Sequence, residues 1–287
     1  MSVLATEDSV IPGLTNDDIK ALVAELIGTF LFVFLGAGSI VTANYIHAPS
    51  ATGLLIAAFG NGLGLALAIT IVGHISGGHL NPAVTIALWV SQRIATVLAI
   101  LYIIFQLGGA ILAGLALKAI FSAGIWGPVH LGSPSLPVSG VSFGTGVLIE
   151  AILTFFLVMA VFGTAVDPRH PQIGGFGIGL VVMIDVLVGG PLTGAAMNPA
   201  RAFGPMVAAN FWSNHIIYWI GPVLGAIVAS LIYGYLLMPH EQIDIASAPA
   251  TPGSDILPVP APEVNQAVAD DSTLIVEEVD EETVQDE

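Results

Sequence analysis

Long stretches without any charged residue dominate the chain. A bilayer core of about 30 Å needs about 20 apolar residues for each helical span, and several of these stretches are longer than that. They do not alternate between polar and apolar residues as the strands of a membrane β-barrel would. The pattern therefore predicts an all-α membrane protein. The stretches without Asp, Glu, Lys or Arg are residues 26–92, 94–117, 119–149 and 202–240.

Six transmembrane helices are predicted, together with two helices that are too short to cross. The short helices begin at Pro82 and Pro199 and extend for about ten residues each, about half of the length that a span needs. Non-spanning backbone is tolerated at membrane depth only where protein buries it or where it lines a wet cavity. We therefore expect two re-entrant half-helices beside a cavity. The six spans are expected near residues 20–43, 52–73, 96–121, 144–166, 174–189 and 215–238.

The two halves of the chain repeat one another. AELIGT, which contains Glu25, recurs 125 residues later as EAILT, which begins at Glu150. Each repeat, at about residues 20–121 and 144–238, has three spans, so the second copy is inverted in the membrane and the half-helices enter from opposite faces. Inverted repeats with broken helices also occur in secondary transporters. A second repeated motif is Asn81-Pro82-Ala83, which returns 117 residues later as Asn198-Pro199-Ala200.

The charges divide the chain into three parts. The net charge is −16, but residues 239–287 hold 13 acidic and no basic residues, so we expect this tail to be disordered. Residues 20–238 form the membrane domain, and residues 1–19 are an N-terminal segment. Basic residues lie before the first span and in the second-to-third and fourth-to-fifth connections, whereas the opposite loops, 44–51 and 122–143, have none. The positive-inside rule therefore predicts that both termini are cytoplasmic. The basic residues concerned are Lys20, Arg93 and Arg169.

Each Asn-Pro-Ala triplet has the chemistry of an abrupt helix start. Asn is favoured at the helix N-cap, and Pro is favoured at the first helical position. The Asn side-chain oxygen accepts a backbone N–H, which leaves its NH₂ group as a donor. Two such starts that meet head to head place two donors and two positive dipole ends at one point. A water molecule there would present its oxygen to both donors, and protons would meet a positive field.

The two polar motifs, HISGGHLNPAVT at residues 74–85 and GGPLTGAAMNPARAFGP at residues 189–205, resemble the signature loops of the aquaporin, or major intrinsic protein, family. The resemblance covers residues 20–238, with AELIGTFLFVF, EAILTFFLV and YWIGP as further matches, and it looks closest to plant tonoplast intrinsic proteins and bacterial relatives. It implies an aquaporin-like channel domain with a pore in each subunit, passive flow, no cofactor and a homotetramer in the lipid bilayer.

The same resemblance implies a selectivity constriction of four side chains. Water-specific members narrow this ring with an aromatic residue and a His, but two of the matching residues here are small and apolar. We therefore expect a wider ring that passes water and small neutral solutes such as ammonia, urea or hydrogen peroxide. Glycerol facilitators have Asp directly after the ring Arg, where this chain has Ala202, and this favours water over glycerol. The four positions are Asn61, Val186, Ala195 and Arg201.

Two symmetric carboxylates leave an alternative open. Glu25 and Glu150 could accept hydrogen bonds from the backbone of the re-entrant loops, which is the role that we favour. They could instead carry protons, as acidic groups within membrane spans do in pumps. A proton- or ion-coupled secondary transporter of a small solute is therefore the alternative to a passive channel.

Four further polar residues have weaker assignments. His74 is a candidate pore-lining residue, and His79 is expected to pack in its loop. No zinc site is expected from this pair, because no third ligand is near. The role of Asp185, beside the ring position Val186, is left open. His130 is expected to be exposed, and contact with Arg201 is the alternative.

Other classes of function find no support in the sequence. Cysteine is absent, and no nucleophile–base pair, metal cluster or phosphate loop is present, so neither an enzyme nor a metal site is expected. No nucleic-acid partner is expected. A signal for secretion or for an organelle is not recognisable, so we expect the plasma or bacterial inner membrane first and the vacuolar membrane second.

Overall fold

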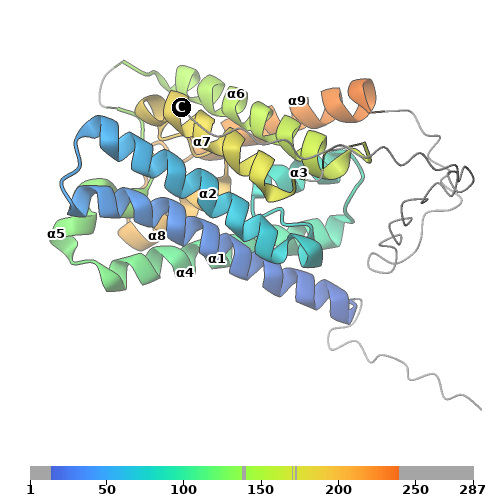
Figure 1. The fold of residues 1–287 in the computed structure, drawn as a ribbon, viewed down its shortest axis with the longest axis horizontal. Helices are drawn as coiled ribbons and strands as arrows, with labels where there is room; N and C mark the ends of the chain where they lie inside the picture. The colour runs from blue at the N-terminus through green and yellow to red at the C-terminus, as the bar shows by residue number, and fades with distance from the viewer. Residues whose placement is uncertain (1–13, 138–139, 170, 172, 239–287) are drawn as a thin grey trace, which may run out of the picture. The chain divides into compact units, whose positions relative to one another are not determined.

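The computed structural model describes residues 14–137, 140–169, 171 and 173–238 (Figure 1). The acidic segment 239–287 and most of the N-terminal segment, for which the sequence made predictions, lie outside the described residues. Within the described part, all regular structure is helical, as the charge-free stretches predicted.

Six helices are long and apolar enough to cross a membrane, which confirms the predicted number. Their outward faces carry large apolar side chains, as helices in contact with lipid do. Two of them continue into wider turns, η2 and η3. The helices are α1 Asn16–Tyr45, α2 Ser50–Ser76, α4 Thr96–Ile120, α6 Phe143–Val161 with η2 Phe162–Val166, α7 Gly175–Thr193, and α9 Ile217–Ile232 with η3 Tyr233–Leu237.

The predicted half-helices are present. They are α3, Pro82–Val90, and α8, Pro199–Ala209, with nine and eleven residues. Figure 1 shows them toward opposite ends of the long helices. In each, the Asn before the Pro caps the helix, since Asn81 Oδ1 accepts the Ala83 N–H at 2.8 Å and Asn198 Oδ1 accepts the Ala200 N–H at 2.9 Å.

The two repeats exchange their half-helices. In the first repeat α1 packs against α2 and α4, and in the second α6 packs against α7 and α9. The half-helix α3 of the first repeat packs against α9 of the second, and α8 of the second packs against α4 of the first. This interlocking brings the two loops that precede the half-helices to the same place.

Close helix contacts depend on glycine. A Cβ on Gly179 of α7 would lie 2.4 Å from the carbonyl oxygen of Gly62 in α2, so the two backbones touch there. A Cβ on Gly225 of α9 would lie 2.0 Å from the carbonyl oxygen of Ala151 in α6. Such small residues let helices pack closely within a bilayer, where the hydrophobic effect does not drive helices together.

The connection from α4 to α6 folds back onto α1. It contains α5, Ala123–Trp126, and η1, Gly127–Gly132, with the chain turned at His130 and Leu131, where φ is 46° and 56°. This connection packs against both α1 and α8. It therefore reaches the surroundings of the second half-helix, where the candidate site lies.

Candidate functional site

A buried carboxylate holds the loop before α8. Glu150, in α6, is fully buried and accepts three hydrogen bonds. The donors are Thr193 Oγ1 at 2.6 Å, the Ala196 N–H at 3.0 Å and the Met197 N–H at 2.7 Å. These backbone groups would otherwise be unpaired at membrane depth, where an unpaired group is costly.

The symmetric carboxylate holds the loop before α3 in the same way. Glu25, in α1, is fully buried, and it accepts from Ser76 Oγ at 2.7 Å, the His79 N–H at 2.9 Å and the Leu80 N–H at 2.7 Å. These donors lie 117 positions before those of Glu150. A fourth donor, Gln106 Nε2 at 2.7 Å, has no counterpart in the second repeat.

The two Asn side chains link the loops to each other. Asn81 Nδ2 donates to the Met197 carbonyl oxygen at 3.0 Å, and Asn198 Nδ2 donates to the Leu80 carbonyl oxygen at 2.8 Å. An amide NH₂ has two N–H bonds, so one donor on each Asn is left after these contacts. The sequence predicted the capping and the meeting of the two starts, but not this exchange of hydrogen bonds between them.

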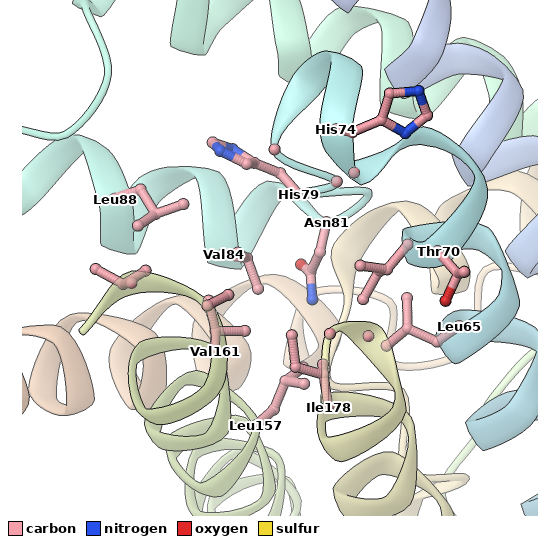
Figure 2. A pocket seen from close by; sticks show the side chains of 18 of the residues that line it. Leu65, Thr70, His74, His79, Asn81, Val84, Leu88, Leu157, Val161 and Ile178 are labelled. Atoms are coloured by element: carbon pink, nitrogen blue, oxygen red, sulfur yellow. The ribbon is translucent and has the colours of Figure 1, made fainter. Parts of the chain in front are cut away.

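A cavity of about 660 Å³ opens beside Asn81. Figure 2 shows the Asn81 amide pointing into this space, whose walls include Val84, Leu157 and Ile178. The lining is mostly apolar, so the amide is a polar point in an apolar wall. A molecule in this cavity meets the first Asn-Pro-Ala motif directly.

The histidines of the first motif lie at the edge of this cavity. His74 is exposed and belongs to the lining, but in Figure 2 its ring is turned away from Asn81. His79 places Nδ1 3.1 Å from Thr85 Oγ1 and its ring 5.0 Å from that of Tyr102, edge to face. His79 therefore packs in the loop, and within the described residues no group of three His, Cys, Asp or Glu could hold a metal.

Arg201, the third residue of α8, is held from two sides. It is 1% exposed. Its Nε donates to Asn61 Oδ1 at 3.2 Å, and its Nη1 donates to the Gly132 carbonyl oxygen at 2.8 Å. The other two candidate ring residues, Val186 and Ala195, are also buried. The structure thus brings Asn61 and Arg201 into contact from positions 140 residues apart.

The contact with Gly132 was not predicted from the sequence. His130, in that loop, was predicted to be exposed, with contact to Arg201 as the alternative. It is instead partly buried, and its ring stacks on Phe211 with centroids 3.7 Å apart and planes at 5°. The turn of the chain at His130 and Leu131 directs the Gly132 carbonyl toward Arg201 instead. A backbone acceptor carries no sequence signal, so only the fold reveals it.

Asp185 is the unexplained group near this site. It lies in α7 beside Val186, is 5% exposed, and its Oδ2 has no hydrogen-bond partner. The carboxylates of Glu25 and Glu150, in contrast, are each bonded by several donors.

Comparisons with known proteins identify relatives of this chain. The Major intrinsic protein family model matches residues 14–233. "Probable aquaporin TIP3-2" of Arabidopsis thaliana is 44% identical over 234 residues, which is 78% of this chain and 85% of the relative. "Aquaporin TIP4-4" of Zea mays is 44% identical over 235 residues, or 78% of this chain and 90% of the relative.

The fold is also similar to a solved structure. The X-ray structure of the aquaglyceroporin from Plasmodium falciparum aligns with a TM-score of 0.63 at 22% identity, over 77% of this chain and 97% of that chain. At this identity the likeness concerns the fold alone. Together with the family model and the relatives, it leads to one conclusion: the chain belongs to the major intrinsic protein family.

Proposed function

We propose that the protein is a passive channel that conducts water and small neutral solutes through a membrane and excludes protons and ions. One observation carries this proposal. Two helix starts, each capped by an Asn, meet within the protein and exchange hydrogen bonds, and the amide of one of them points into a cavity whose lining is mostly apolar (Figure 2).

The paired helix starts explain how water could pass while protons are excluded. The remaining N–H donors of Asn81 and Asn198 can bind the oxygen of a passing water. The N-termini of α3 and α8 carry partial positive charge, which opposes a proton or another cation at this point. The apolar residues around the site offer no competing hydrogen bonds, so water is released easily.

Arg201, with Asn61, Val186 and Ala195, forms the selectivity constriction in this proposal. The guanidinium adds a fixed positive charge, and Val186 and Ala195 add little volume. The Asn61 amide is turned onto Arg201 by their hydrogen bond. These features support a ring without aromatic narrowing, wide enough for water, ammonia, urea or hydrogen peroxide.

The contacts of the two carboxylates favour a channel over a coupled transporter. Both oxygens of Glu25 and of Glu150 accept hydrogen bonds from the re-entrant loops. A group that picks up and releases protons would have to break these contacts in each cycle. The geometry therefore supports a structural role for both residues, and we assign no catalytic activity.

The assembly and location are part of the proposal. The family resemblance supports a homotetramer. The TIP-type relatives favour the vacuolar membrane over the plasma or bacterial inner membrane. Lys20, Arg93 and Arg169 support cytoplasmic termini by the positive-inside rule.

The test compares the native chain with Asn198→Asp in proteoliposomes by stopped-flow light scattering, first with sucrose and then with urea as the osmolyte. The substitution removes the donor to the Leu80 carbonyl oxygen and places a carboxylate at the helix starts. We expect water permeability to fall roughly tenfold or more, since an added barrier of about 1.4 kcal/mol suffices for that. Re-swelling of native vesicles in urea would support the wide ring.

A matched control makes the same chemical change away from the site. Asn214 is exposed and far from the helix starts in sequence, and its amide donates a hydrogen bond to Ser213 Oγ, so Asn214→Asp should conduct like the native chain. Native protein that is folded but passes no more water than empty vesicles would overturn the proposal.

A further inference from the structure

The contacts that hold Arg201 lead back to two consecutive residues of α1. On one side, Asn61 Oδ1 accepts from Arg201 Nε, and Asn61 Nδ2 lies 3.3 Å from the Gly36 carbonyl oxygen. On the other side, the Gly132 carbonyl oxygen accepts from Arg201 Nη1, and Gly132 packs against Ala37. Both supports of the guanidinium therefore rest on α1, although α1 places no side chain on Arg201 in the described contacts.

The contact at Gly36 leaves no room for a side chain. A Cβ at this position would lie 2.5 Å from Asn61 Oδ1 and 3.0 Å from Asn61 Cγ, and separations under 3.0 Å are essentially never seen for real Cβ atoms. The atom that would be struck first is the acceptor of the Arg201 hydrogen bond. Any side chain at position 36 must therefore move Oδ1.

The Asn61 amide cannot move away without losing other bonds. Its Nδ2 donates to the Ala57 carbonyl oxygen at 2.8 Å and contacts that of Gly36. Both amide atoms of Asn61 are thus bonded to protein. This suits a residue that orients Arg201 more than one that binds a passing solute.

The contact at Gly132 is equally close. Its φ is +74°, a region that L side chains rarely adopt, and a Cβ there would lie 2.7 Å from the Ala37 carbonyl oxygen. The loop carbonyl that accepts from Arg201 is therefore placed against the same turn of α1.

We propose that Gly36 is a positioning residue for Arg201, and that α1 sets the selectivity of the constriction through Asn61. The inference rests on the proposed role of Arg201 in the constriction. Gly36 makes the close approach of α1 and Asn61 possible, and this approach fixes where Oδ1 meets the guanidinium.

The first test is Gly36→Ala, read as the ratio of urea to water permeability in proteoliposomes. A displaced Asn61 releases one side of the guanidinium, which then spreads over more of the opening and slows the larger solute more. We expect the ratio to fall roughly threefold to tenfold, the effect of losing one hydrogen bond. Gly38→Ala is the matched control, because a Cβ there would meet only the flexible end of Leu117, at 3.1 Å.

A double-mutant cycle with Asn61→Ala separates positioning from general damage to the helix. If Gly36 acts through Asn61, then Gly36→Ala has no further effect on the ratio once Asn61 is Ala. An additive effect of the two substitutions would overturn the proposal. The cycle also remains informative if Gly36→Ala alone does not fold. The double variant should then fold, because the Asn61 amide that clashes with the new Cβ has been removed. Failure of both would again overturn the proposal.

Arg201→Val separates a failure of the proposed constriction from a failure of the proposed role of Gly36. If this variant keeps the native ratio, the proposed constriction itself is wrong. If Arg201→Val and Asn61→Ala change the ratio while Gly36→Ala behaves like Gly38→Ala, the constriction stands and the role of Gly36 is refuted.

Discussion

At the scale of single residues, the structure separates buried polar groups that are bonded from those that are not. Among the described residues, only three buried side-chain atoms lack a hydrogen-bond partner, on Thr29, Gln106 and Asp185. Asp185 is the one of these that can carry a charge. A buried polar group without a partner costs about 1–3 kcal/mol, and a charged group costs more.

We therefore predict that Asp185→Asn raises the thermal stability of the protein. The substitution keeps the volume of the side chain and removes the charge, so we expect a gain of about 1 kcal/mol or more from the desolvation cost avoided. Intrinsic fluorescence during heating in detergent would measure it as a higher midpoint temperature. The control is Asp167→Asn, which removes a carboxylate that is bonded to Arg169 and should lower the midpoint. A lower midpoint for Asp185→Asn would show that this carboxylate is stabilised by a partner.

The residues of the site could be named from the sequence where a motif or the family resemblance carries them. The two Asn-Pro-Ala triplets and Arg201 were recognisable because they lie next to one another in contiguous sequence motifs. The resemblance also named Asn61 as a ring position, but its hydrogen bond to Arg201, 140 residues away, was not predicted. The Gly132 carbonyl, 69 residues from Arg201, was not named at all. The Gly132 partner is a backbone carbonyl, which any residue has. Gly36, which packs against Asn61, has no side chain that a sequence pattern could reveal.

At the scale of elements, the two re-entrant loops look alike but are supported unequally. Glu150 has three donors, which come from Thr193 at the end of α7 and from the loop before α8. Glu25 has a fourth, Gln106 Nε2, while Gln106 Oε1 is buried and unpaired. A Gln at position 25 could give its new N–H to that oxygen once the Gln106 amide is reversed, although the Leu80 N–H would still lose its acceptor. At position 150 the new N–H has no such partner.

We therefore predict that Glu150→Gln is more harmful than Glu25→Gln. At both positions the new NH₂ group replaces an oxygen that accepts a loop N–H, so one loop donor is left unpaired. At position 150 the NH₂ group also lacks an acceptor of its own, which costs about 1–3 kcal/mol more. Midpoint temperature and water permeability of the two variants, prepared side by side, give the comparison. Equal losses, or a larger loss for Glu25→Gln, would contradict the compensating role of Gln106.

The long elements followed from the sequence to within a few residues, and the largest differences are the start of α1, at Asn16 rather than near residue 20, and the end of α7. The span predicted at 174–189 continues in the structure to Thr193, as the end of α7, although it contains Pro191. The helix tolerates it because Pro removes only one donor, and the loop that follows is held by Glu150 through Thr193 and the next residues.

At the scale of the whole described domain, one cluster of side chains joins three parts of the chain. These are the connection before α7, the connection between α3 and α4, and the end of η3 with the residue after it. Arg169, before α7, donates to both oxygens of Asp167 and to the Leu237 carbonyl oxygen at the end of η3. Arg93, between α3 and α4, donates to Met238 Sδ at 3.2 Å. The inverted repeat was predictable from the matching motifs, but this closure joins residues within and between the repeats that share no sequence pattern.

The cluster predicts a loss of stability in acid. Hydrogen bonds from the Arg169 guanidinium hold the pKa of Asp167 well below its usual range. A carboxylate with a lowered folded-state pKa stabilises the fold fully above its unfolded pKa of about 3.9, and this contribution is lost as the pH falls below that value. The midpoint temperature of the native chain should therefore drop between about pH 5 and pH 3.

Asp167→Asn isolates this contribution. The variant should start from a lower midpoint near neutral pH and lose less of it on acidification, because the group that titrates is gone. The Arg169 side chain is 59% exposed, so salt should screen the pair and reduce the difference between the two proteins. Identical acid profiles for both proteins at low salt would show that Asp167 and Arg169 do not hold the end of η3 to the connection before α7.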